Sequence, residues 1–187
     1  MTTLQALYAS TGRAFPAALS DWDEVVDRFI ADYEERFGQS EISTINLDSA
    51  YFLFDHGFDR VVLAYAMSTL QLTRRDSTRM RGFPNVNVSV RRVLGEAAFM
   101  ADKGHYLGHA SGGILDINLF PQRRELNRGW SAEGKRFRSM ERYVAEHPGA
   151  FFYHRPIYDD ESWVPASLEY AVLKEGATWW KDTFRNK

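Results

Sequence analysis

The chain has 187 residues, of which 44% are hydrophobic and 14% aromatic, and this is enough to bury one core without disulfides or a large partner. It contains no cysteine, which excludes a disulfide scaffold, thiolate zinc sites and cysteine nucleophiles. The formal net charge is −2, but residues 1–60 carry four Arg against eleven Asp and Glu, so residues 61–187 carry a net charge of +5. We expect a single domain, with residues 1–60 as an acidic, largely helical N-terminal extension and residues 61–187 as the functional core.

The start of the chain lacks the features of a membrane or export signal. Its first residues, MTTLQALYASTGRAF, have neither the basic start nor the long apolar stretch of a signal peptide, and no window approaches the length of a bilayer span. We therefore expect no membrane partner and a cytoplasmic location, with leaderless export as the open alternative.

Two segments show the periodicity of amphipathic helices. Between residues 20 and 38, apolar side chains recur at helical spacing, a Ser precedes them and a Gly follows them. Between residues 131 and 147, apolar side chains form one stripe after a Ser and before a Pro-Gly pair, which cannot continue a helix. Both segments are predicted to be helices.

Other segments favour strands. Residues 58–73 are rich in β-branched and apolar side chains, which indicates one or two strands, with a helix as the alternative. Residues 86–113 read as a strand or short helix that runs into a glycine-rich loop. Residues 151–158 and 167–173 are separated by turn-like residues and predict an antiparallel strand pair. The expected fold class is therefore α+β with an antiparallel sheet.

Residues with hydrolytic chemistry gather in one stretch of the chain. It contains Asp102-Lys103-Gly104-His105, then Gly108-His109, then the run NLFPQRRELNRG at residues 118–129. Phosphodiester hydrolysis needs a base for water, a hard cation with oxygen ligands, and cationic side chains that hold the substrate. The ordinary pKa of an imidazole lies near neutrality, so His105 is a candidate base, and Asn and Glu suit magnesium.

Basic clusters lie on both sides of this stretch. Residues 74–92 hold six Arg and one Asp, and residues 121–142 hold seven basic and three acidic side chains. Either cluster by itself is typical of a solvated face, but two clusters around one candidate site favour a nucleic-acid partner. The first group is equally compatible with a grip on the nucleic-acid backbone and with a solvated connection. The four arginines considered for this role are Arg74, Arg75, Arg79 and Arg81.

DKGH followed by NLFPQRRELNRG resembles the DNA/RNA non-specific endonuclease family of the ββα-metal, or His-Me finger, superfamily, whose signature is D-R-G-H followed by N-x-x-P-Q and a later N. The resemblance covers residues 60–175 and is strongest between Asp102 and Glu141. It implies a ββα-metal core, a magnesium ion for which Mn²⁺ substitutes, and a 5′-phosphate product.

Carried over by position, the resemblance implies roles for three residues. His105 would be the general base, Asn127 the direct magnesium ligand, and Asn118 would brace the site through hydrogen bonds. Lys103 stands where the family usually has Arg, so it keeps a positive charge but loses the bidentate fork that Arg offers a phosphate. Either the phosphate contact is weaker than in the family or another cation compensates, and the candidates for that cation are Arg123, Arg124 and Arg128.

The resemblance also implies a downstream acid that serves the metal. Two glutamates compete for that role. Glu141 lies about 21 Å from Asn127 if one straight helix joins them, so the chain must turn between the two residues. Glu133 is nearer in sequence but falls in the first turn of the predicted helix, where a carboxylate often only complements the helix dipole. We favour Glu141, which borders the apolar stripe.

His109 has two further interpretations. Together with His105 it forms an i, i+4 pair that could bind zinc on a helix, as in metalloproteases, but the surrounding glycines oppose a helix. We expect His109 to contact the substrate or support the site, with a structural role as the alternative. We interpret the remaining histidines as structural residues. Four tryptophans could stack on the bases of a single strand, but packing is the favoured interpretation for each of them. The histidines are His56, His147 and His154, and the tryptophans are Trp130, Trp163, Trp179 and Trp180.

The sequence thus predicts a metal-dependent, sequence-tolerant endonuclease that acts on DNA, RNA or both. The first alternative is an inactive nucleic-acid-binding module on the same fold, and the second is a zinc hydrolase built on His105 and His109. A competition toxin, a defence nuclease and a scavenging enzyme would share this chemistry, and a toxin would have an inhibitor or immunity protein as partner. The acidic residues 1–60 would be suited to covering a basic site. The sequence does not predict an oligomeric state.

Overall fold

A computed structural model describes residues 2–47, 49–71, 85–113, 116–175 and 177–187. Its helices are α1 (Leu4–Ala9), α2 (Asp23–Phe37), α3 (Val86–Leu94), α4 (Arg124–Arg128) and α5 (Ala132–Glu146). Its strands are β1 (Ile42–Leu47), β2 (Ala50–Asp55), β3 (Arg60–Met67), β4 (Ala101–His105), β5 (Leu119–Arg123), β6 (Phe151–Ile157), β7 (Ser167–Lys174) and β8 (Thr178–Arg185). Single turns of 3₁₀ helix are η1 (Leu19–Asp21), η3 (Gly95–Ala97), η4 (His109–Ser111) and η5 (Asp116–Asn118).

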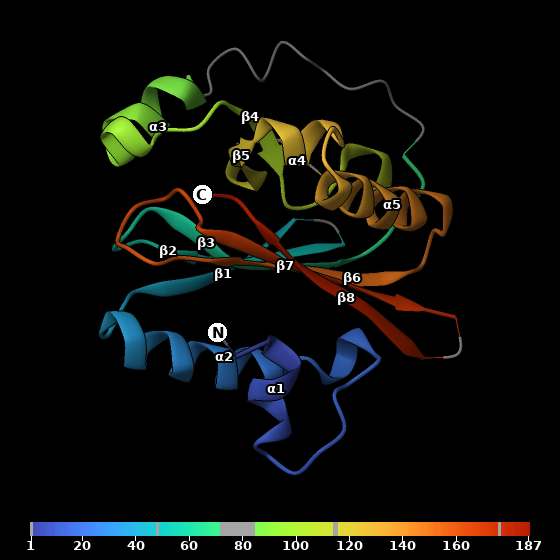
Figure 1. The fold of residues 1–187 in the computed structure, drawn as a ribbon. Helices are drawn as coiled ribbons and strands as arrows, with labels where there is room; N and C mark the ends of the chain where they lie inside the picture. Colours follow the sequence, from blue (N-terminus) through green and yellow to red (C-terminus); the bar gives the residue numbers. More distant parts are fainter. Residues whose placement is uncertain (1, 48, 72–84, 114–115, 176) are drawn as a thin grey trace.

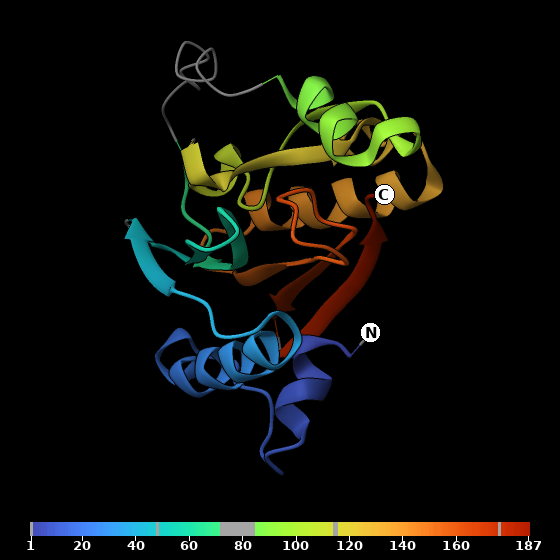
Figure 2. The same ribbon diagram turned by 90° about the vertical axis from the view of Figure 1, so that its left-hand side faces the viewer.

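The elements form three layers, and the middle layer is an antiparallel sheet (Figure 1). The sheet has six strands in the order β1-β2-β3-β6-β7-β8, and every neighbouring pair is antiparallel. Helices α1 and α2 cover one face, while α3, α4, α5 and the β4–β5 pair cover the other (Figures 1 and 2). The expected α+β class with an antiparallel sheet is confirmed.

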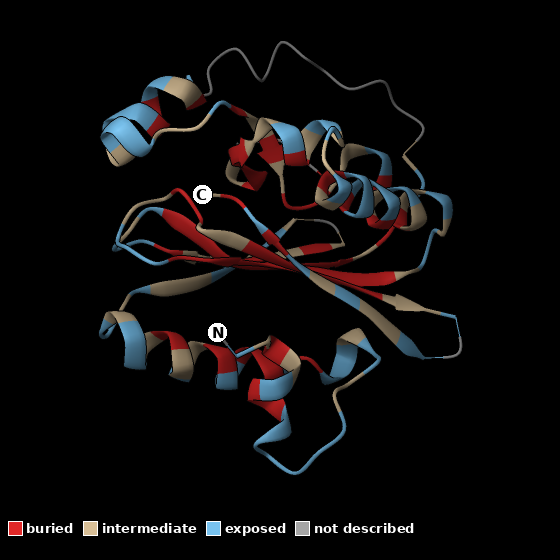
Figure 3. Cartoon of the chain, in the orientation of Figure 1, coloured by how far each residue is buried: buried red, intermediate tan, exposed pale blue. Residues whose placement is uncertain are grey.

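The sheet is apolar on both faces because it separates two cores (Figure 3). Successive residues of a strand point to opposite faces, so Phe152 packs into the core beneath α5 while Phe151 packs into the core against α2. The same alternation explains why every residue of β6 is buried. A buried central sheet gives the layer above it a rigid floor.

The layer above the sheet contains a ββα unit. Strands β4 and β5 form a separate two-stranded antiparallel sheet, and α4 follows β5 directly. Gly129 ends α4 in the left-handed conformation, with φ of 70°, and this turns the chain into α5. The ββα arrangement that the motif resemblance implied is therefore present, with the DKGH residues on β4 and Asn127 on α4.

The local predictions for the longer elements are confirmed. The helix expected between residues 20 and 38 is α2, and the helix expected from residue 131 is α5, where the Ser131 hydroxyl accepts a hydrogen bond from the Gly134 N–H at 2.9 Å. The α2 start differs in one respect, because Ser20 lies in η1 and Trp22 occupies the N-cap position without a side-chain hydrogen bond. Strands β6 and β7 form the predicted antiparallel pair.

Two segments with alternative interpretations are now decided. The apolar run at residues 58–73 forms one strand, β3, over its described part, and the helix alternative is wrong. In residues 86–113 both structures occur in sequence, since α3 comes first and β4 follows. Asn85 starts α3 by accepting hydrogen bonds from two backbone N–H groups, which explains why a β-branched segment begins as a helix.

The structure corrects the predicted division at residue 60. Residues 1–60 are not largely helical, because β1 and β2 lie within them and β2 pairs with β3 in the central sheet. Helix α1 and the acidic helix α2 also lie on the face of the sheet opposite the ββα unit, so they do not cover it (Figure 1). Among the described residues, no helix is both long and apolar enough to cross a membrane.

Candidate active site

His105 is the last residue of β4, and the β4–β5 pair determines its position. The register places His105 opposite Leu119 and Gly104 opposite Phe120. Gly104 is required here, since a Cβ atom at this position would lie 2.4 Å from the Cβ of Gln122, a fully buried residue of β5. The glycine in DKGH thus lets β5 approach β4 closely next to His105.

Asn118 fixes the backbone that follows His105. Its side chain is fully buried, and its amide pairs with both backbone groups of Leu107: Oδ1 accepts from the Leu107 N–H at 2.9 Å and Nδ2 donates to the Leu107 carbonyl at 2.8 Å. The Asn118 carbonyl also accepts from the Tyr106 N–H at 3.1 Å. These contacts are those expected of a residue that braces the site.

Asp102 holds the α4 residues of the motif together. Its carboxylate accepts from Arg124 Nε at 3.1 Å, from Arg128 Nε at 2.5 Å and Nη2 at 3.2 Å, and from Asn127 Nδ2 at 3.5 Å. Partial burial raises the pKa of Asp102, but the hydrogen bonds from Arg128, Arg124 and Asn127 outweigh it and leave the pKa below its usual value. Asp102 is therefore ionised near neutral pH and neutralises part of the positive charge on α4.

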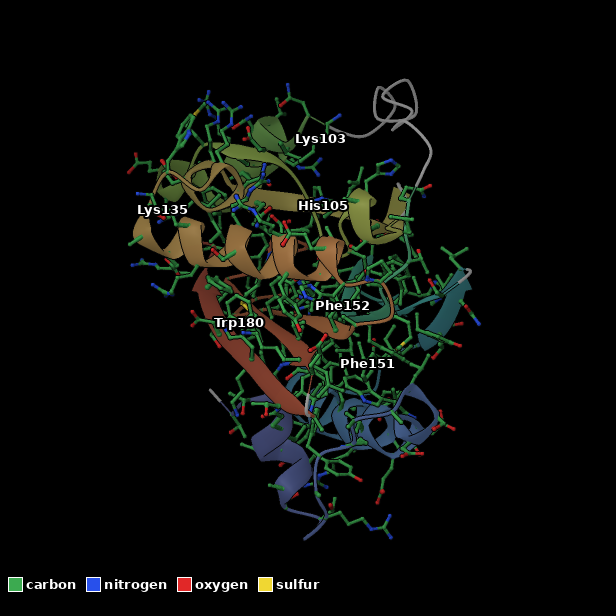
Figure 4. All side chains as sticks on the ribbon, turned by 90° about the vertical axis from the view of Figure 1, so that its right-hand side faces the viewer. Lys103, His105, Lys135, Phe151, Phe152 and Trp180 are labelled. Carbon is green, nitrogen blue, oxygen red and sulfur yellow. The ribbon has the colours of Figure 1, made fainter. Side chains whose placement is uncertain are left out.

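Glu141 projects from α5 toward His105. Glu141 Oε1 lies 3.9 Å from His105 Nδ1, and both side chains are less than one fifth exposed. Figure 4 shows His105 between β4 and α5, with Phe152 on the sheet beneath the helix. Glu133 lies elsewhere, near the start of α5, where its carboxylate accepts from the Arg185 N–H at 2.6 Å. Of the two glutamates that competed in the sequence, Glu141 is the one beside His105.

A cavity of about 390 Å³ opens at this pair. Its wall includes His105, Glu141 and His109, together with two arginines of α5, Arg138 and Arg142. Arg138 Nη1 also lies 3.6 Å from Glu141 Oε2. The cavity therefore combines an imidazole, a carboxylate and two guanidinium groups, which is a set suited to an anionic substrate.

Burial disfavours the charged forms of two titratable groups at and beneath this cavity, Glu141 and His154. Burial raises the pKa of Glu141 to about 7, and the nearby Arg138 only partly opposes this. His154 of β6 is fully buried behind His105, and burial, followed by the charge of His105, holds its pKa well below the ordinary value. Tyr170 of β7 packs on His154 with ring centroids 3.8 Å apart. A neutral His154 thus adds no positive charge beside His105.

The donor set fits a hard divalent cation with few protein ligands. Within the described residues, Glu141 Oε2 is buried without a hydrogen-bond partner, and a cation beside it would stabilise the ionised carboxylate. Asn127 turns its amide nitrogen toward Asp102, so its Oδ1 atom is the one that a cation would use. No cluster of three or more His, Asp or Glu suited to a metal occurs in the described part of the chain, and magnesium usually keeps several waters instead.

The zinc interpretation gains no support from this geometry. His105 ends a strand and His109 begins η4, so the two side chains are not on one helix as the metalloprotease pattern requires. Both nevertheless line the cavity, and the contact of His109 with substrate stays a prediction.

The other predicted cations lie outside the cavity wall. Arg124 and Arg128 are engaged by Asp102, and the guanidinium of Arg123 lies 5.7 Å from the Phe99 ring centroid. Lys103 is on β4, two residues before His105. Their roles at the substrate stay predictions. Arg74, Arg75, Arg79 and Arg81 lie outside the described residues.

Sequence reasoning missed three residues of the site. The sequence identified Asp102 only as the first residue of the DKGH motif. Its role as ion-pair partner of Arg124 and Arg128 could not be predicted, because it depends on how α4 packs back along β4. Arg138 and Arg142 belong to the basic cluster at residues 121–142, and the sequence alone assigned neither of them a role at the site. Their spacing of four residues, with Glu141 between them, places all three on one helix face and is a signal that the sequence did contain.

A second, larger cavity of about 760 Å³ lies on the other side of Tyr106. It contains neither His105 nor Glu141, and its wall is mostly apolar, with Phe54, Tyr158 and Trp163 among its residues. The chemistry of the motif therefore belongs to the smaller cavity.

No protein-family model and no curated protein matches the chain. Among solved structures, one similar chain comes from the crystal structure of the EndoG/EndoGI complex, which concerns the mechanism of EndoG inhibition. It has 12% identity and a TM-score of 0.47 over 87% of this chain and 80% of its own. Another is an extracellular endonuclease, with 14% identity and a TM-score of 0.44 over 81% of each chain. At TM-scores below 0.5, neither likeness decides the function of this chain.

Proposed function

We propose that the chain is a metal-dependent, sequence-tolerant endonuclease that hydrolyses phosphodiester bonds of DNA, RNA or both, with His105 as the general base. The observation that carries the proposal is His105 Nδ1 at 3.9 Å from the buried Glu141, in a cavity that two arginines also line. Of this group the DKGH motif contributes His105, while NLFPQRRELNRG contains Asn118 and Asn127, the residues assigned below to bracing and to the cation.

The residues of the chain divide the work as follows. Above its raised pKa of about 7, or with a cation beside it, Glu141 is ionised, and its charge on the Nδ1 side of His105 then favours a proton on that nitrogen, so Nε2 is left to accept the proton of the attacking water. The same charge stabilises the imidazolium that results. Arg138 and Arg142 bind the phosphate, while Asn118 holds the segment after His105 in place.

Asn127 and Glu141 are the residues that would hold the cation, Mg²⁺ by preference and Mn²⁺ as a substitute. When bound, such a cation supplies positive charge that stabilises the transition state of phosphodiester hydrolysis. Asp102 contributes by orienting Asn127 through the amide nitrogen.

The test is cleavage of supercoiled plasmid and of structured RNA by the purified protein, with magnesium and with EDTA. His105→Ala is expected to lose cleavage by about 100-fold or more. His56→Ala is the matched control, because His56 is an exposed histidine in the turn after β2, does not line this cavity and hydrogen-bonds the Ser43 hydroxyl. Circular dichroism and thermal unfolding establish that both variants are folded.

Three results contradict the proposal in different ways. Cleavage that persists in His105→Ala would remove His105 as base. Binding of both substrates without cleavage would make the chain a binding module. Cleavage that survives EDTA would remove the metal from the reaction.

A further inference from the structure

Trp130 is exposed at the end of the ββα unit. Its side chain is 61% exposed, and few large hydrophobic side chains in the described part of the chain are comparably open to solvent. A single exposed apolar residue is usual on a protein surface and by itself needs no function. Three properties of its surroundings separate Trp130 from that case.

The backbone of Trp130 is fixed. Its N–H donates to the Glu125 carbonyl at 3.0 Å, across the left-handed Gly129 that ends α4. The turn is also packed against α5, since a Cβ atom on Gly134 would lie 3.0 Å from the Gly129 Cα. The indole therefore projects from a rigid turn, and a ligand that binds it has little loop entropy to overcome.

One face of the indole already has a cationic neighbour. The guanidinium of Arg128 lies 5.0 Å from the Trp130 ring centroid, and Asp102 holds that guanidinium through two hydrogen bonds. Within the described residues, no other aromatic ring packs on Trp130. The pair forms a flat platform that presents aromatic surface to solvent.

The platform belongs to the same ββα unit as His105. Trp130 follows Asn127 by three residues, and its partner Arg128 contacts Asp102, which lies three residues before His105 on β4. Three residues of strand span about 10 Å, so Asp102, which holds Arg128, lies about 10 Å from His105 along β4, a length that a nucleic-acid strand covers in about three nucleotides at the rise of a duplex. The surroundings are also cationic, because Arg124 and Arg128 share the single carboxylate of Asp102.

We propose that Trp130 and Arg128 form a stacking platform for an unpaired base of the substrate, close to the phosphate that is cut, so that the enzyme prefers single-stranded or looped nucleic acid. The inference rests on the proposed function. A base in a duplex is already stacked on both faces and cannot stack on the indole, whereas an unpaired base can. Every base has a π-face, so the platform adds strand preference without adding sequence preference.

The test measures binding in a background that cannot cut. The protein carries His105→Ala and is kept in EDTA, and fluorescence anisotropy reports the Kd for three labelled probes of equal length: a single strand, a single strand with abasic positions, and a duplex. Trp130→Ala is expected to weaken binding of the single strand by about tenfold or more, and to change binding of the abasic strand and the duplex by less than about twofold. Trp130→Phe is expected to restore part of the loss.

Two further measurements separate stacking from a structural effect. Val88→Ala is the control, because Val88 is a similarly exposed apolar side chain, at 64%, on α3. It is expected to leave all three Kd values unchanged. The single strand should also quench tryptophan emission in the protein that keeps Trp130 more than in Trp130→Phe, which a merely structural role would not produce.

The outcomes distinguish this inference from the proposed function. If Trp130→Ala binds all probes as the parent does, or weakens the abasic strand and the normal strand equally, the platform is wrong even where the wild type cuts nucleic acid. If the His105→Ala protein binds no probe and the wild type cuts nothing, the proposed function itself fails.

Discussion

His105 Nδ1 and Glu141 Oε1 lie 3.9 Å apart, although His105 ends β4 and Glu141 lies within α5. The fold produces this pair by turning the chain at Gly129, which returns α5 across the ββα unit. A single residue on each of two elements therefore defines the centre of the site.

The first prediction concerns the choice between the two glutamates. Glu141→Gln is expected to lower the cleavage rate by about 100-fold or more, because the charge beside His105 and the cation is lost. Glu133→Gln is the matched control and is expected to keep the rate within about threefold, since an amide oxygen still accepts from the Arg185 N–H. Rates are compared on plasmid with magnesium at neutral pH.

The same variants test where the cation binds. Magnesium is expected to raise the Tm of the wild type and of Glu133→Gln, but not of Glu141→Gln, because a ligand that binds only the folded state stabilises it. An equal rise in Tm for both variants would place the cation away from Glu141.

The second prediction concerns Asp102. Asp102→Asn is expected to lower the cleavage rate by about 10- to 100-fold, because Arg124, Arg128 and Asn127 lose their shared partner. Asp182→Asn breaks another surface ion pair, with Arg136 at 2.8 Å, and is expected to leave the rate unchanged. If both variants lose activity alike, the effect of Asp102 is general surface charge and its positioning role is wrong.

The third prediction tests the close approach of β4 and β5. Gly104→Ala is expected to lower the free energy of unfolding by about 1–3 kcal/mol, since the new methyl group would meet the Cβ of Gln122. At Gly108 an added Cβ would meet its nearest atom, the Ser111 hydroxyl oxygen, at 3.4 Å, and the backbone there is extended. Gly108→Ala should therefore stay within about 0.5 kcal/mol of the wild type in urea unfolding.

The fourth prediction concerns stability in acid. Asp55 is buried and accepts hydrogen bonds from the Ser40 and Tyr33 hydroxyls and from the Gly57 and Phe58 N–H groups. Burial raises its pKa, but these donors outweigh burial and hold the pKa below its usual value. A depressed pKa means that this stabilisation is present above the unfolded value of about 3.9 and is lost as pH falls below it.

Asp55→Asn is therefore expected to lower the free energy of unfolding at pH 7 by about 2–4 kcal/mol and to flatten its decline below about pH 4. Asp27→Asn, at an exposed position on α2, is expected to change neither. Urea unfolding across the pH range is the measurement. A parallel acid decline in Asp55→Asn and the wild type would show that other carboxylates control acid unfolding.

The sequence by itself determined the elements whose signals are local. The apolar stripe and Ser131 cap of α5 depend only on neighbours within a few residues, and so do the strand pair β6–β7 and the turn between them. The motif likewise brought His105, Asn118 and Asn127 together as candidates before any contact was known. Such patterns can be interpreted without a structure because they involve residues that are close together in the sequence.

Only the tertiary structure decided what depends on distant partners. The placement of β1 and β2 in the central sheet depends on pairing with β3, and the choice of Glu141 over Glu133 depends on the turn that returns α5 to β4. The engagement of Arg128 by Asp102 is of the same kind, because a charge that reads as a free cation in the sequence finds its partner only when α4 folds back on β4. Local periodicity does not show which helix and strand faces pack against each other, and this packing determines which charged side chains become partners.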